Sequence, residues 1–145
     1  MPTNLQAPPG APARTLPVTD KDSVAFWTGG TQGELLIFRC ADCAYYVHPP
    51  VRFCPQCESR DVAPQPVSGR GRIASFTINH KQWVPGLPVP YVLALVALEE
   101  QDDVRIATNI VNVAPDAVRM DMKVRVVFEQ QEEIAIPFFE PADAA

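Results

Sequence analysis

The sequence predicts a mainly β protein in which a short N-terminal helix is followed by a metal-binding ribbon and a five-stranded barrel. Three observations lead to this fold class. All four cysteines of the 145-residue chain fall in two C-x2-C pairs, several β-type segments follow those pairs, and a short apolar stretch precedes them. A chain of this length has room for one domain or two small ones.

The first 17 residues are predicted to form a disordered tail. Five prolines in this stretch oppose both helix and sheet, namely Pro2, Pro8, Pro9, Pro12 and Pro17. The tail lacks the basic segment and continuous apolar run of a signal peptide, so we expect a cytoplasmic protein in a reducing compartment. The longest wholly apolar run, Tyr91–Leu98, is too short to span a bilayer as a helix, so no membrane is expected as a partner.

Residues 18–33 are predicted to form an N-terminal helical segment. Asp20 or Asp22 can cap a helix through residues 23–27, because a short polar side chain accepts hydrogen bonds from the first free N–H groups. Three glycines are expected to end this helix, namely Gly29, Gly30 and Gly33.

The four cysteines of the predicted ribbon are expected to bind one structural metal ion. These ligands are Cys40, Cys43, Cys54 and Cys57. Four thiolates satisfy tetrahedral zinc and leave no position for water, so we expect zinc in a structural role. Iron is the chemical competitor, because four thiolates also suit that metal. Disulfides or redox dithiols are the other alternative, which a reducing compartment disfavours, and His48 is interpreted as a loop residue rather than a ligand.

The ribbon is predicted to span residues 34–66. Residues 35–38 form a strand that enters the first cysteine pair, and residues 45–47 return from it as a hairpin. Metal binding contributes on the order of 10 kcal/mol of folding free energy in isolated zinc-finger peptides. We therefore expect this segment to order only with its ion.

The barrel is predicted to span residues 67–141. Its five β segments are residues 73–79, 91–98, 105–111, 124–128 and 134–138. One helical turn at residues 114–118 separates the third segment from the fourth. This order is typical of the oligonucleotide/oligosaccharide-binding (OB) fold, and an open five-stranded sandwich is the alternative.

Several short motifs also follow one another in a specific order along residues 20–141. They are Phe26-Trp27, Gly33, Leu35-Leu36, Arg39-Cys40, the two cysteine pairs around Pro49-Pro50, Ser68-Gly69-Arg70-Gly71, Ser75-Phe76-Thr77 and Pro90-Tyr91-Val92. This order resembles the domain of unknown function 35 family, whose members combine an N-terminal helical segment, a rubredoxin-like zinc ribbon and an OB-fold barrel. Ala44 and Glu58 stand where that family often has glycine, and a left-handed backbone there would cost each of them a little.

The resemblance implies an accessory role in lipid metabolism. Members of the family act as small, non-catalytic partners of thiolase-like proteins, including thiolases, synthases and lipid-transfer-type aldolases. It therefore implies a thiolase-like partner and an acyl-CoA thioester, with a barrel that helps to form the channel for this ester. The sequence itself contains no nucleophile elbow, phosphate-binding loop or dinucleotide fingerprint, and no cysteine beyond the metal ligands.

Five residues are candidates for contact with CoA or with the partner, namely Arg70, Arg72, His80, Lys81 and Trp83. The two arginines lie in a glycine-containing loop that suits a CoA phosphate, or forms a plain turn. The residues from His80 to Trp83 begin a proline-rich loop that binds a partner or acyl chain, or packs on itself. If a partner normally covers this loop, the isolated protein could form a homodimer.

Two other functions compete with the accessory role. Zinc ribbons and OB folds both occur in nucleic-acid-binding proteins, but a net charge of -5 opposes phosphate binding. The other alternative is an independent thioesterase or hydratase that uses His80 with an acid such as Glu99.

Overall fold

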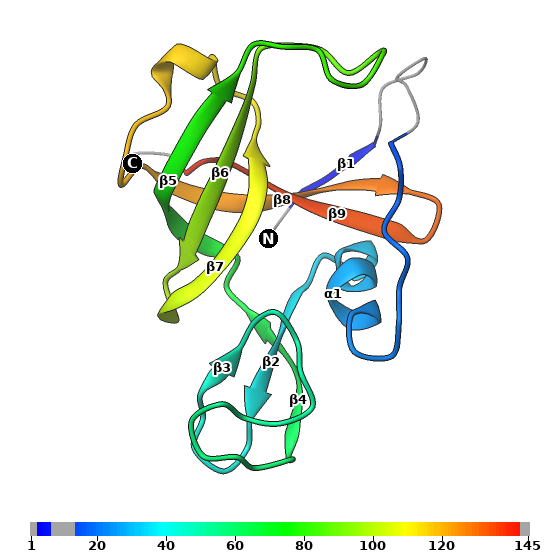
Figure 1. Ribbon diagram of the computed structural model, residues 1–145, viewed down its shortest axis with the longest axis vertical. Helices are drawn as coiled ribbons and strands as arrows, with labels where there is room; N and C mark the ends of the chain where they lie inside the picture. The colour runs from blue at the N-terminus through cyan, green and yellow to red at the C-terminus, as the bar shows by residue number, and fades with distance from the viewer. Residues whose placement is uncertain (1–2, 7–13, 143–145) are drawn as a thin grey trace.

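The barrel occupies one end of the molecule and the cysteine-bearing ribbon the other, with a short helix beside them (Figure 1). The structure is a computed structural model that describes residues 3–6 and 14–142. Among these residues, no helix is long and apolar enough to cross a membrane.

The barrel is a closed sheet of five strands. In chain order they are β5 (Arg70–Asn79), β6 (Tyr91–Leu98), β7 (Gln101–Ile110), β8 (Lys123–Gln131) and β9 (Ile134–Pro141). They pair in the order β5-β6-β7-β9-β8, and β8 pairs with β5 to close the ring. β7 meets β9 in parallel at one residue pair, and the 3-10 turn η2 (Pro115–Ala117) lies between β7 and β8. The predicted OB fold is confirmed, and the open sandwich is wrong.

The barrel core follows the alternation of the strands. On β6, Val92, Ala94 and Val96 point inward and are buried, whereas Leu93 and Leu95 point outward. The largest fully buried side chains of the core include those of Phe128 and Phe139. Burying such rings stabilises the fold by roughly 1.5–3 kcal/mol each.

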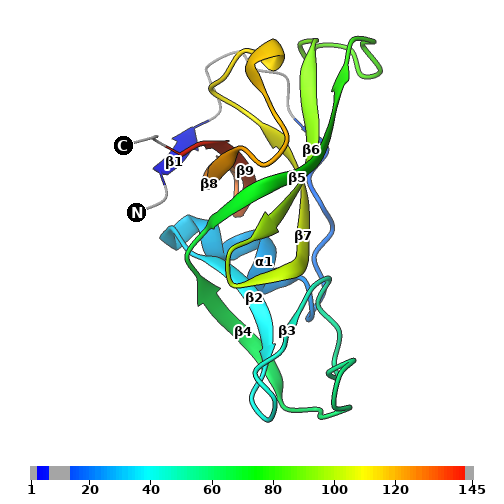
Figure 2. The same ribbon diagram turned by 90° about the vertical axis from the view of Figure 1, so that its left-hand side faces the viewer.

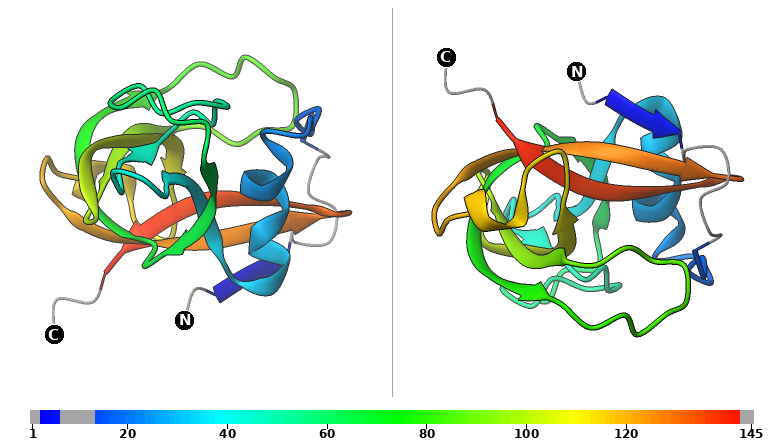
Figure 3. Two further views of the ribbon diagram at one scale, coloured as in Figure 1. Left: turned by 90° about the horizontal axis from the view of Figure 1, so that it is seen from below. Right: turned by 90° about the horizontal axis from the view of Figure 1, so that it is seen from above.

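The N-cap position of the helix is Ser23, which makes no side-chain cap hydrogen bond, so the expected cap at Asp20 or Asp22 is corrected. Asp20 instead orders the turn that leads into the helix. Its carboxylate accepts hydrogen bonds from the backbone N–H groups of Asp22 at 2.9 Å and Ser23 at 2.8 Å. The α-helix α1 (Val24–Thr28) follows and continues as the 3-10 helix η1 (Gly29–Gln32). Together they pack across β8 and β9 (Figure 3).

Gly29 is the C-cap of α1, so the α-helix ends at the glycines as the sequence predicted, although Gly29 and Gly30 continue the segment as η1. A Cβ atom at Gly30 would lie 2.3 Å from a ring carbon of Phe128, so this position needs glycine for close packing against β8. Gly33 alone ends the segment, in a left-handed conformation with φ 78°.

The expected disordered tail contains a short strand. β1 (Thr3–Gln6) pairs in parallel with residues 127–130 of β8. β5 pairs only with residues 123–125 of β8, so on that side the backbone of residues 127–130 is available to pair with another strand. At Thr3–Gln6 the structure therefore differs from the expected tail, because pairing with a distant strand cannot be read from local composition. Residues 1–2 and 7–13 of that tail lie outside the described residues.

The ribbon is a three-stranded sheet in the order β3-β2-β4. It consists of β2 (Leu35–Cys40), β3 (Tyr46–Val47) and β4 (Val62–Val67). The β2–β3 pairing is the predicted hairpin. β4 was not predicted, because its sequence contains Pro64 and Pro66, which a strand tolerates only at a sheet edge such as this one. After Val67, β5 rises from the ribbon to the opposite end of the barrel (Figure 2).

Candidate metal centre and contact surfaces

The four cysteines gather at the tip of the ribbon. Cys40 ends β2, Cys43 follows in the next turn, and Cys54 and Cys57 belong to a second turn. All four sulfur atoms lie within 4.8 Å of one another, with Cys40 and Cys57 3.6 Å apart and Cys43 and Cys54 3.5 Å apart. In tetrahedral zinc with Zn–S bonds of about 2.3 Å, the sulfurs are about 3.8 Å apart. The donor set therefore fits a single metal ion.

Each cysteine pair is shaped by the residue that follows it. The N–H of Ala44 donates to the carbonyl of Cys40 at 2.9 Å, and the N–H of Glu58 donates to that of Cys54 at 2.8 Å. Ala44 and Glu58 adopt left-handed backbones with φ 66° and 64°. The two turns thus have a left-handed backbone at the positions where the resembled family often has glycine, although neither residue is glycine.

Electrostatics explain why this cluster needs a cation. The N–H of Cys43 is the main cause of a Cys40 pKa lowered to about 7. The N–H of Ser59 acts to lower the pKa of Cys57, but the neighbouring thiols and desolvation outweigh it and raise this pKa to about 12. Four thiolates so close together are stable only with a metal ion between them.

His48 lies apart from the metal ligands. Its ring packs against Phe26 with the centroids 5.0 Å apart. Burial lowers the pKa of His48 to about 4. In the described part of the chain, only the four cysteines form a cluster of His, Cys, Asp or Glu suited to a metal ion.

Arg70 and Arg72 line a cavity of about 370 Å³ at the ribbon end of β5. Lys123 lies directly opposite Arg72 on β8 and lines the same cavity. The Arg72 guanidinium pairs with Asp102 at 2.6 Å and with Asp121 at 2.9 Å. Neither Arg70 nor Lys123 has an ion pair with another described residue, so these two are the cations open to a ligand.

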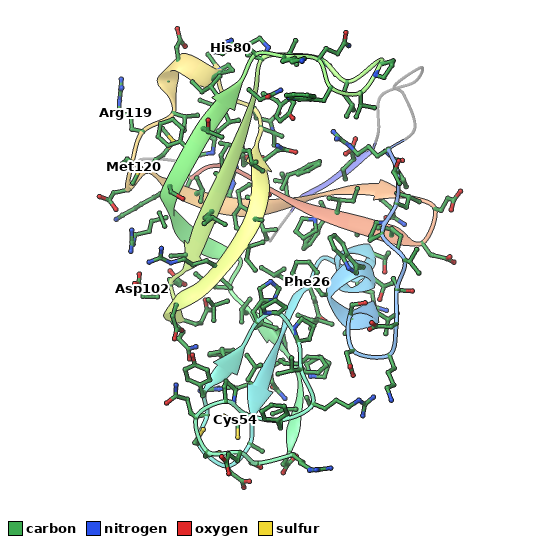
Figure 4. All side chains as sticks on the ribbon, in the orientation of Figure 1. Phe26, Cys54, His80, Asp102, Arg119 and Met120 are labelled. Atoms are coloured by element: carbon green, nitrogen blue, oxygen red, sulfur yellow. The ribbon has the colours of Figure 1, made fainter. Side chains whose placement is uncertain are left out.

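His80, Lys81 and Trp83 lie at the other end of β5, in the loop that leads to β6. Figure 4 shows His80 at the end of the barrel opposite Asp102. β5 is ten residues long, and a strand of that length extends roughly 30 Å. The structure therefore brings Arg70 together with Arg72, and His80 with Lys81 and Trp83, but it separates the two groups.

The same separation excludes His80 and Glu99 as an acid–base pair. The N–H of Glu99 donates to the carbonyl of Arg70 at 3.0 Å, which places Glu99 at the ribbon end of β5. Because His80 follows the opposite end of that strand, the two side chains cannot act on one substrate atom.

Lys123 is a candidate contact residue that sequence reasoning missed. It is the first residue of β8, immediately before the apolar residues of that strand, and lies 51 positions after Arg72. Only the pairing of β5 with β8 places it at the cavity. No local pattern around Lys123 indicates this role.

Two family descriptions match the chain in adjacent segments. The ChsH2 rubredoxin-like zinc ribbon domain matches residues 27–63, and the ChsH2 C-terminal OB-fold domain matches residues 64–129. A chain in the solved structure of the Ltp2-ChsH2(DUF35) aldolase is 36% identical, with a TM-score of 0.78. The match covers 88% of this chain and 100% of that one.

Two curated relatives are longer proteins. The probable enoyl-CoA hydratase alpha subunit of Thermomonospora curvata is 35% identical over 130 residues, which is 89% of this chain and 40% of that protein. The 3-oxo-4,17-pregnadiene-20-carboxyl-CoA hydratase alpha subunit of Mycobacterium tuberculosis is 36% identical over 125 residues, 86% of this chain and 39% of that protein. The chain thus spans about 40% of the length of these relatives.

Proposed function

Because the chain belongs to the DUF35/ChsH2 family, we propose that it is a non-catalytic accessory subunit of a thiolase-like enzyme acting on acyl-CoA thioesters. The observation that carries this proposal is its match to the whole of a chain from the Ltp2-ChsH2(DUF35) aldolase. The two curated relatives support the substrate class, since both are named for reactions of CoA thioesters. The cytoplasm, whose reducing conditions preserve free thiolates, is the proposed location.

The ribbon has a structural part in this proposal. Zinc is the proposed ion, because it accepts four thiolates in a tetrahedral site and requires no redox partner. With every position taken by a cysteine, the ion would stabilise the ribbon without binding substrate. All four cysteines of the chain are used in this way, so none remains as a thiolase-type nucleophile.

The barrel supplies the proposed contact with CoA. Arg70 and Lys123, which form no ion pair with another described residue, line a cavity whose third cation, Arg72, is held in place by two carboxylates. Guanidinium and ammonium groups bind phosphate through charge-assisted hydrogen bonds. We therefore assign the CoA phosphates to this end of the barrel, and the acyl group to the channel that the barrel forms with its partner.

Affinity capture from the native host tests the accessory role. A tagged chain should recover a stoichiometric thiolase-like protein, identified by mass spectrometry, and should raise the solubility or the turnover of that protein. The eluted chain should contain one zinc ion and lack the visible absorption of an iron–tetrathiolate site. Recovery of no thiolase-like protein, or no effect on its solubility and turnover, would contradict the proposal.

A second experiment tests the cavity. Replacing Arg70 and Lys123 together by alanine should weaken CoA binding to the complex about tenfold or more, as measured by calorimetry, because two charge-assisted contacts are lost. Arg60→Ala is the matched control, since Arg60 is an exposed ribbon residue away from the cavity. Equal CoA affinity in both variants would remove the cavity from the proposal.

A further inference from the structure

The loop between β5 and β6 presents a tryptophan to solvent. Trp83 is 66% exposed and its neighbour Val84 is 51% exposed. The loop lies at the end of the barrel opposite the ribbon (Figures 1 and 4). An indole so exposed contributes little to the core, whereas tryptophan is enriched among the residues that dominate binding at protein interfaces.

Hydrogen bonds within the loop hold this indole in place. Trp83 Nε1 donates to Asn79 Oδ1 at 3.0 Å, and Asn79 Nδ2 donates to the carbonyl of Lys81 at 2.6 Å. Gln82 Nε2 donates to the carbonyl of Leu87 at 3.0 Å, on the other side of the turn. Because the ring is already ordered, docking it into a partner costs little conformational entropy.

The charged side chain that contacts this tryptophan is positive. The ammonium group of Lys81 lies 4.2 Å from the centroid of the Trp83 ring, and His80 precedes it. No aspartate or glutamate occurs between Ile73 and Leu98, although the chain as a whole has a net charge of -5. The surface that complements this loop is therefore an apolar pocket with carboxylates at its rim.

One lysine beside a histidine is too little positive charge for a nucleic-acid site. Binding to a phosphate backbone depends on several lysines and arginines that neutralise successive phosphates. A single tryptophan beside a single lysine is instead typical of an anchor residue at a protein interface. A protein partner is thus the occupant that the observations favour.

We propose that Trp83 is the anchor by which this chain docks onto its thiolase-like partner. Its indole enters an apolar pocket of that protein, and Lys81 and His80 pair with carboxylates at the rim. This inference rests on the proposed function and assigns the contact to one loop. Since β5 separates the loop from Arg70 and Lys123, partner docking and CoA binding depend on different residues.

The test compares Trp83→Ala with Met120→Ala in binding to the thiolase-like protein recovered by the wild-type chain. Met120 is a matched control, because it is 54% exposed and lies in the connection between β7 and β8. Both variants should keep the metal content and unfolding midpoint of the wild-type chain. Trp83→Ala should raise the Kd at least about 30-fold, and Lys81→Glu should raise it about tenfold. Met120→Ala should change it less than about threefold.

Each possible result supports or overturns the inference. Unchanged affinity of Trp83→Ala, with a wild-type chain that binds, overturns the inference and leaves the proposed function intact. Failure of the wild-type chain to bind any thiolase-like protein overturns the proposed function, and the inference with it. A salt-dependent shift of fluorescent oligo(dT) by the wild-type chain, abolished in Trp83→Ala, assigns the loop to nucleic acid and overturns the inference.

Discussion

The side-chain amide of Gln101 makes two hydrogen bonds with the backbone of Tyr46. The N–H of Tyr46 donates to Gln101 Oε1 at 2.9 Å, and Gln101 Nε2 donates to the carbonyl of Tyr46 at 2.8 Å. The hydroxyl of Tyr45 donates to Asp103 at 2.5 Å beside them. These contacts join the ribbon to the start of β7 in the barrel, so the metal centre and the cavity beside the β6–β7 turn belong to one connected structure.

Replacing Gln101 by alanine should therefore loosen the ribbon from the barrel. Two hydrogen bonds to the backbone are lost, and we expect the free energy of unfolding to fall by about 1–3 kcal/mol. Urea denaturation of the metal-loaded protein measures the change. Gln65→Ala, at an exposed position of β4, should change it by less than about 0.5 kcal/mol. Equal effects of the two variants would show that the Gln101 contact contributes nothing.

Removing the metal should affect the barrel selectively. The ribbon amides are expected to lose protection from hydrogen exchange, because the folded ribbon depends on its ion. In the barrel, the start of β7, which carries Gln101 and Asp103, should lose protection, since its contacts with Tyr45 and Tyr46 are then broken. The loop that carries Trp83 should keep its exchange rates. Uniform loss of protection across the barrel would contradict this picture.

Stability should depend on pH through His48. Burial lowers the pKa of His48 from its ordinary value of 6.5 to about 4, so the unfolded chain binds a proton between these two values while the folded chain does not. Stability is therefore complete above pH 6.5 and falls as the pH decreases toward 4. At pH 5 the free energy of unfolding is lower by about 2 kcal/mol because of His48.

His48→Phe is the variant that isolates this effect. It keeps an aromatic ring beside Phe26 but has no group to protonate, and both proteins release metal from the same cysteines at low pH. The difference in urea stability between wild type and variant should thus change by about 2 kcal/mol between pH 7 and pH 5. A constant difference would contradict the assignment to His48.

The positions that follow the cysteine pairs should favour glycine. Ala44 and Glu58 have φ angles of 66° and 64°, which strain any residue that has a Cβ atom. Ala44→Gly and Glu58→Gly should each stabilise the protein by about 0.5–1 kcal/mol, after subtraction of the greater freedom of glycine in the unfolded chain. Ala63→Gly, in the extended β4, should destabilise it by a similar amount. Thermal unfolding in excess zinc compares the three, and destabilisation by all of them would refute the prediction.

Arg14 should stabilise the barrel by neutralising Glu129. The two side chains pair at 2.6 Å, and Glu129 is only 8% exposed. Arg14→Ala leaves this carboxylate unpaired and should cost about 1–3 kcal/mol. In Glu129→Gln the charge is absent, so adding Arg14→Ala to that variant should cost clearly less. A double-mutant cycle by urea denaturation measures the difference, and strict additivity would show that the pair is not coupled.

Features that depend on neighbouring residues in the chain could be predicted from the sequence. The spacing of Cys40 and Cys43, and of Cys54 and Cys57, determines that two turns can each present two sulfurs to one ion. Short apolar segments of β type identified the barrel strands, and the helical turn between the third and fourth indicated the OB order. The start of the helix was predicted to within a few residues, although its N-cap is Ser23 and Asp20 orders the turn before it.

The tertiary structure alone decided which distant residues meet. It paired β1 with the free half of β8, and it placed Lys123 opposite Arg72. It also separated Arg72 from Trp83 by the length of β5, although the two lie only 11 positions apart in the chain. Spacing along a sequence predicts contacts within a turn, whereas an extended strand carries nearby residues to opposite ends of the molecule and a sheet brings remote ones together. For that reason, the residue types at the candidate surfaces were determined by the sequence, and their division between the two ends of β5 by the fold.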